Sequence, residues 1–105
     1  MLRGELPRLP EMGRRSDVLR AQILTADEAA REDPGAEDRI GYLARVYHAN
    51  NFLHEARIAY GLAHRVEPHR PEHPYLLGLL ETSAGQNERA VTFLGQSLDI
   101  DPDYA

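Results

Sequence analysis

The sequence predicts an all-α fold built from repeated helical hairpins, and two observations carry this prediction. Three acidic-proline pairs stand 34 residues apart along the chain: Asp33-Pro34, Glu67-Pro68 and Asp101-Pro102. Small and large apolar residues also recur at matching positions between these prolines. A constant period of this length is typical of chains whose units each bury an apolar face against the next unit.

Composition restricts the function before any motif is considered. The chain has 105 residues, of which 42% are hydrophobic, and this is sufficient for one modest core. Its 12 Lys and Arg against 17 Asp and Glu give a net charge of −5, which disfavours a nucleic-acid binder because such a protein needs a basic surface. The absence of cysteine excludes disulfides and thiolate catalysis. A neutral or cationic polypeptide is the partner that this charge favours.

The beginning of the sequence predicts no regular element. Residues 1–15 contain Gly4, Pro7, Pro10 and Gly13 and are expected to form an extended or disordered leader. They contain no long apolar run, so they are neither a secretory signal nor a membrane-spanning helix, and no membrane contact is expected. The compartment stays open: cytoplasmic, or exported if the natural protein is longer and its signal lies outside these residues.

The period divides most of the chain into two units, residues 37–70 and 71–105. The diagnostic positions of the first unit hold Ile40, Leu43, Ala44, Tyr47, Ala56, Tyr60, Ala63 and Pro68. Those of the second unit hold Pro74, Leu77, Gly78, Glu81, Ala90, Leu94, Ser97 and Pro102. Small residues at the third and fifth of these positions allow the two helices of each unit to cross closely.

Turn and capping signals predict five helices. Asn50-Asn51 and Gly85-Gln86 tolerate left-handed backbone and separate the two helices of each unit. The four helices of the units are expected at 36–49, 52–65, 72–84 and 87–99. Ser16 or Asp17 is a suitable cap for a further helix in residues 16–36, which we interpret as an N-terminal half repeat that covers the first unit.

The residues at these positions resemble the tetratricopeptide repeat family over both units, and over most of the chain if the half repeat is included. The segments 43–49 (LARVYHA) and 75–80 (YLLGLL) are similar to bacterial members of this family, which are commonly exported and longer. The resemblance implies a right-handed superhelix of about five helices. It also implies a protein-binding scaffold whose concave groove receives a peptide or a partner's helix.

The groove positions of that family, carried over to this sequence, imply a small set of candidate binding residues. Tyrosine and arginine often anchor interfaces, which favours a binding role for part of this set. The alternative is that these side chains are solvated or make contacts within the solenoid. The set is Tyr42, Arg45, His48, Tyr75 and Leu79.

No constellation of residues indicates catalysis, so we expect a protein that is not an enzyme and has no cofactor. The acidic residues form no isolated pair in a predicted cleft, and there is no Gly-rich phosphate loop or nucleophile elbow. His69 and His73 have a ligand-like interval, with Glu67 and Glu72 as possible further ligands. Solvated surface histidines are the favoured interpretation, and no metal site is expected.

Glu81 occupies a position that is normally apolar and faces inward. One interpretation is that it pairs with a neighbour such as Arg89 or Thr82. The favoured one is that Leu77 and Leu80 fill the space while the carboxylate leans into solvent.

The last predicted helix carries apolar residues that a solenoid would cover with its next helix: Val91, Phe93, Leu94 and Leu98. One interpretation is that further units of a longer protein cover them. Another is that two copies of the chain form a homodimer through them. A third is that the repeats are the docking arm of a protein with an enzymatic or electron-transfer domain elsewhere.

Overall fold

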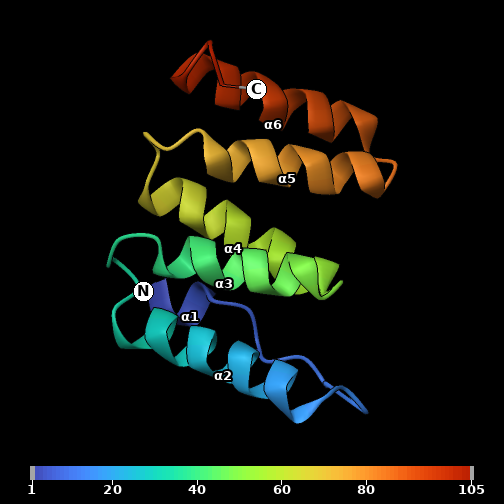
Figure 1. The fold of residues 1–105 in the computed structure, drawn as a ribbon. Coiled ribbons are helices and arrows are strands. Elements are labelled where there is room, and N and C mark those ends of the chain that lie inside the picture. Colours follow the sequence, from blue (N-terminus) through green and yellow to red (C-terminus); the bar gives the residue numbers. More distant parts are fainter. Residues whose placement is uncertain (1, 105) are drawn as a thin grey trace. The chain divides into compact units, whose positions relative to one another are not determined.

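The computed structural model describes residues 2–104, which form six α-helices and no strand (Figure 1). The all-α prediction is confirmed over this range. The chain divides into two compact units, Met1–Ala59 (unit 1) and Tyr60–Ala105 (unit 2), and their boundary lies inside α4. The helices are α1 (Leu2–Glu5), α2 (Asp17–Glu32), α3 (Arg39–Ala49), α4 (Leu53–Val66), α5 (Glu72–Ser83) and α6 (Asn87–Ile100).

The helix boundaries follow local signals closely. Ser16 caps α2, since its hydroxyl oxygen accepts a hydrogen bond from the Leu19 amide at 3.2 Å. The two expected turns contain Asn51 with φ 63° and Gly85 with φ 76°, both in the left-handed region. The helix expected from residue 36 begins only at Arg39, because Asp38 adopts φ 58° and ψ 10° and interrupts the helical backbone.

The first residues of the chain differ from the expected extended or disordered leader. Residues 2–5 form the single turn of α1, and Leu6 and Pro7 are buried. The guanidinium of Arg3 donates to the main-chain oxygens of Arg31 and Glu32 at the end of α2. These contacts join residues far apart in sequence, so local composition does not show them.

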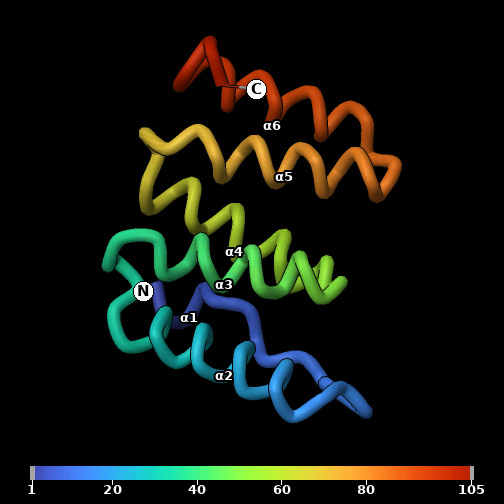
Figure 2. Tube along the Cα trace, viewed as in Figure 1, coloured from blue at the N-terminus to red at the C-terminus, as the bar shows by residue number. Residues whose placement is uncertain are grey.

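Unit 1 is organised by α2 and α3, which pack against each other (Figure 2). Both helices contribute one apolar face, and the first turns of α4 add small side chains to the same core. The buried residues are Ile23, Ala26 and Ala30 of α2, Ile40, Leu43, Ala44, Val46 and Tyr47 of α3, and Ala56 and Ala59 of α4.

Unit 2 is organised by the hairpin of α5 and α6 (Figures 1 and 2). A Cβ placed on Gly78 of α5 would stand 2.7 Å from Leu94 of α6 and 3.4 Å from the carbonyl oxygen of Ala90. The expected close crossing of these helices is therefore confirmed. At the other end of the hairpin, the buried hydroxyl of Ser97 donates to the carbonyl oxygen of Pro71 at 2.9 Å.

None of the helices formed by residues 2–104 is both long enough and apolar enough to cross a lipid bilayer.

Replacing Gly78 with alanine tests the helix crossing. A gain in helix propensity of about 1 kcal/mol is opposed by a steric cost of about 1–3 kcal/mol, so Gly78→Ala should lower the free energy of unfolding. Gly95 in α6 has no neighbouring atom within 4 Å of an added Cβ. Gly95→Ala should therefore stabilise the protein by about 0.5–1 kcal/mol. Urea unfolding measures both changes, and two substitutions of the same sign would contradict the crossing.

In the core of unit 1, Tyr47 is the largest side chain that has no solvent exposure. Among the residues described, its hydroxyl has no hydrogen-bond partner. Burial, with smaller contributions from the negative charges of Asp27 and Glu55, raises the pKa of Tyr47 to about 12, although Arg31 opposes this. As the pH rises, the phenol of Tyr47 therefore ionises in the unfolded chain before it ionises in the folded chain.

Replacing Tyr47 with phenylalanine should change the free energy of unfolding mainly at high pH. Because the folded pKa lies above the ordinary value of 10, the stabilisation is present below pH 10 and is lost between pH 10 and 12, by up to about 3 kcal/mol. At pH 7, Tyr47→Phe should alter the free energy of unfolding by less than about 1 kcal/mol, since no hydrogen bond is lost. Unfolding curves across this pH range should fall more steeply for the wild type, and parallel curves would refute the assignment.

Candidate functional site

Unit 2 contains an apolar pocket of about 240 Å³ between α5, α6 and the residues that follow α6. The rings of Tyr75 and Tyr104 meet edge to face at one side of it, with centroids 5.2 Å apart. Leu94 forms the wall toward the helix crossing, and Leu98 stands at the rim with 48% of its surface exposed. Ser97 completes the lining, and its hydroxyl is engaged with Pro71.

Tyr104 reaches the pocket because the chain turns back after α6. The side chain of Asp101 accepts a hydrogen bond from the Asp103 amide, and its carbonyl oxygen accepts one from the Tyr104 amide, both at 3.0 Å. Tyr104 is not among the site residues that the sequence predicts. The Asp101-Pro102 turn signal was the available indication.

The pocket continues into an exposed apolar stripe on α6. Val91, Leu94 and Leu98 follow the i, i+3, i+7 spacing that places side chains on one helical face. Val91 is 70% exposed. Phe93, also expected in this surface, is half-buried and does not share the spacing. We call Tyr75, Val91, Leu94, Leu98 and Tyr104 the α6 surface.

Negative charge lies near the α6 surface. Burial raises the pKa of Tyr104, and the carboxylates of Glu72 and Asp101 add to this effect, as does the ring of Tyr75. The overall net charge of the chain has the same sign, at −5. The apolar pocket therefore lies near two carboxylates, and Arg70 already contacts that of Glu72 at 3.2 Å.

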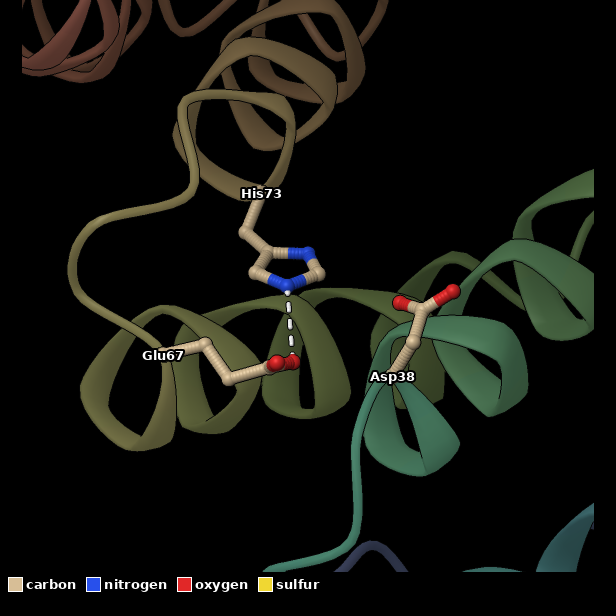
Figure 3. Close-up of side chains that lie close together, drawn as sticks. All are labelled: Asp38, Glu67 and His73. Atoms are coloured by element: carbon tan, nitrogen blue, oxygen red, sulfur yellow. Dashed lines mark hydrogen bonds and ion pairs between the residues drawn. The ribbon is translucent and has the colours of Figure 1, made fainter.

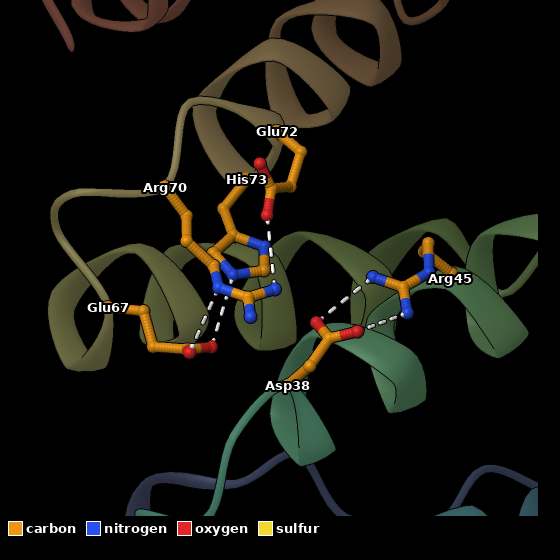
Figure 4. Close-up of polar contacts among 6 residues, drawn as sticks. All are labelled: Asp38, Arg45, Glu67, Arg70, Glu72 and His73. Carbon is orange, nitrogen blue, oxygen red and sulfur yellow. Dashed lines mark hydrogen bonds and ion pairs between the residues drawn. The ribbon is translucent and has the colours of Figure 1, made fainter.

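Unit 1 contains three of the predicted groove residues, and all three lie on α3. Tyr42 is 47% exposed. The guanidinium carbon of Arg45 lies 5.9 Å from the centre of the Tyr42 ring. Arg45 also binds both carboxylate oxygens of Asp38, at 2.7 and 3.2 Å (Figure 4). His48 is partly buried, and this burial lowers its pKa.

Unit 2 contains the other two predicted groove residues, both on α5. Leu79 is exposed to 39%. Tyr75 is half-buried and belongs to the α6 surface through its contact with Tyr104. Exposure therefore makes Tyr42 and Leu79 the more accessible members of the predicted set, while Arg45 and Tyr75 already have intramolecular contacts.

His73 contradicts the expectation of solvated histidines. It has no exposed surface, and its Nε2 lies 3.4 Å from Oε1 of Glu67 (Figure 3). His69 and His54 are exposed as expected. His64 is partly buried, and burial together with the proximity of His73 lowers its pKa. His73 is therefore buried where the α4–α5 connection meets α5. The His69-x3-His73 spacing alone does not show this burial.

Arg70 joins the two carboxylates that the sequence suggested as further metal ligands. Its Nε lies 3.2 Å from Oε2 of Glu67, and its Nη1 lies 3.2 Å from Oε1 of Glu72 (Figure 4). All three side chains are partly buried. The Glu67, Arg70, Glu72 and His73 cluster thus ties the α4–α5 connection to the first turn of α5.

Glu81 differs from the favoured expectation of a solvent-directed carboxylate and agrees with the alternative, in which it pairs with Arg89. It has no exposed surface, and its Oε2 lies 3.0 Å from Nε of Arg89. The side chain of Arg89 is 58% exposed, so its guanidinium covers the carboxylate from the solvent side. Leu77 and Leu80 are buried beside it in α5. The ion pair lets an acid occupy an inward position of the hairpin.

Comparisons of the chain with models of known protein families, with curated proteins and with solved structures find no match.

Proposed function

We propose that the chain is a protein-binding scaffold of the tetratricopeptide repeat type, with a binding rather than an enzymatic role and no cofactor. The 34-residue period supports this assignment. Further support comes from short helices separated by left-handed turns at Asn51 and Gly85, and from the small residue at the crossing of α5 and α6.

The observation that carries the proposal is the α6 surface. An open apolar pocket of about 240 Å³ can take one large apolar side chain, and exposed Val91 and Leu98 extend the contact along α6. The net charge of −5 and the nearby carboxylate of Asp101 favour Lys or Arg beside that side chain. We therefore propose a partner peptide or helix that presents an apolar residue flanked by cationic ones. Tyr42 and Leu79, which are exposed, are candidates for additional contacts within their own units.

Self-association is a second candidate function, favoured by one feature of the same surface. The pocket and the protruding Val91 lie on the same helix, so a second copy related by a two-fold axis could insert Val91 into the partner's pocket while receiving it in return.

Binding through the α6 surface predicts a defined response to charge reversal. Displayed peptides selected on the wild-type chain should be enriched in apolar residues next to Lys or Arg. Leu98→Glu should weaken their binding about tenfold or more, because it places a carboxylate at the pocket rim. Leu24→Glu is a matched control, since Leu24 lies in unit 1 and is 42% exposed. Equal losses in the two variants, or none in either, would rule the surface out.

The homodimer is tested by sedimentation equilibrium at rising concentrations. If copies associate through α6, Val91→Glu should abolish the dimer while leaving the helical circular dichroism signal unchanged. Val18→Glu is the control, because Val18 lies in α2 and is 81% exposed. A wild-type chain that remains monomeric at high micromolar concentration excludes this function and leaves the peptide-binding proposal in place.

A further inference from the structure

Residues 3–7 lie on unit 1 with the contacts of a bound peptide. Arg31 of α2 donates from Nη2 to the carbonyl oxygen of Pro7 at 2.9 Å and from Nη1 to that of Arg3 at 3.4 Å. Arg3 in turn donates to the main-chain oxygens of Arg31 and Glu32. Figure 1 shows α1 beside α2. Each guanidinium thus contacts main-chain oxygens of the other segment.

Arg31 is positioned for this contact by a buried carboxylate. Its Nε lies 3.0 and 3.1 Å from the two oxygens of Asp27, which is only 4% exposed. The remaining guanidinium nitrogens are then directed at the carbonyl oxygens of residues 3 and 7. A guanidinium held in this way can bind the main chain of a peptide without requiring particular side chains. Because Asp27 already holds Arg31 in place, binding costs little conformational entropy at Arg31.

Two side chains of the segment add selectivity. Leu6 is 6% exposed and is the main apolar anchor. Arg3 reaches the carboxyl end of α2, where unpaired carbonyl oxygens carry partial negative charge. Pro7 is buried next to Leu6 and supplies the carbonyl that Arg31 contacts most closely. Together these contacts define the pattern Arg-x-x-Leu-Pro.

An open pocket lies along one side of the segment. It has a volume of about 310 Å³ and lies between the segment and the beginning of α4. The pocket is lined by Gly4, Glu5, Leu6, Pro7 and Arg8 on one side and by His54, Glu55 and Ile58 on the other.

We propose that this surface of unit 1 is a binding site for peptides of the form Arg-x-x-Leu-Pro and that residues 3–7 of the chain occupy it. The site is independent of the α6 surface, which belongs to unit 2. Because the chain's own segment is covalently attached, its effective concentration is high and a separate peptide must compete with it. Release of the segment opens the site to a partner that carries this pattern.

The test uses the full chain and a fluorescent peptide with the sequence of residues 2–12. In a released chain carrying Arg3→Ala and Leu6→Glu, fluorescence anisotropy should show binding about tenfold tighter or more than in the wild type, since the attached competitor is weakened. A peptide with the same two substitutions should not bind. A control chain with Leu9→Glu and Arg14→Ala, both at exposed positions, should behave like the wild type.

A second variant tests the same proposal with less risk of misfolding. Arg3→Ala alone removes only an exposed side chain and should increase peptide binding by a smaller factor. The proposal is overturned if the peptide binds the released chain no better than the wild type, or if the substituted peptide binds equally well. It is also overturned if the released chain loses its helical circular dichroism signal, because residues 3–7 would then be an integral part of unit 1.

Discussion

Close crossing of α5 and α6 over Gly78 is the constraint on which the rest of unit 2 depends. A side chain at this position would collide with Leu94, so the absence of one allows Leu94 to lie directly against α5. Leu94 also lines the apolar pocket together with Tyr75 of α5. The packing that holds the hairpin together and the surface proposed to bind a partner are therefore consequences of the same contact.

Buried polar groups determine how the elements of unit 2 are paired. Ser97 is matched to the carbonyl oxygen of Pro71, His73 to Glu67, and Glu81 to Arg89. A shift of one element would leave each of these groups buried without a partner, at a cost of about 1–3 kcal/mol for each neutral group and more for a charge. These pairs specify one arrangement of the hairpin, while the apolar contacts supply most of its stabilisation.

The two proposed binding surfaces recognise different chemistry. On unit 1, an arginine held by Asp27 donates to main-chain carbonyls, so the recognition of residues 3–7 depends mainly on the backbone and on one apolar anchor. On unit 2, we propose that an apolar pocket near the carboxylate of Asp101 favours an apolar side chain with cationic neighbours. Peptides suited to one surface need not suit the other, and the surfaces can be examined separately.

The sequence by itself determined the five longer helices, the turns inside the two hairpins and the small residue at the crossing of α5 and α6. These features follow from local signals: the 34-residue period, the cap at Ser16, the left-handed turns and the position of Gly78. Tertiary structure alone decided which polar side chains are buried and paired. His73 is buried beside Glu67 although its spacing suggested a solvated side chain, and residues 3–7 are ordered by contacts with Arg31 and other atoms more than 20 positions away. Long-range contacts of this kind leave no periodicity in the sequence, which is why the pocket at Tyr104 and the occupied site on unit 1 could be found only in the folded chain.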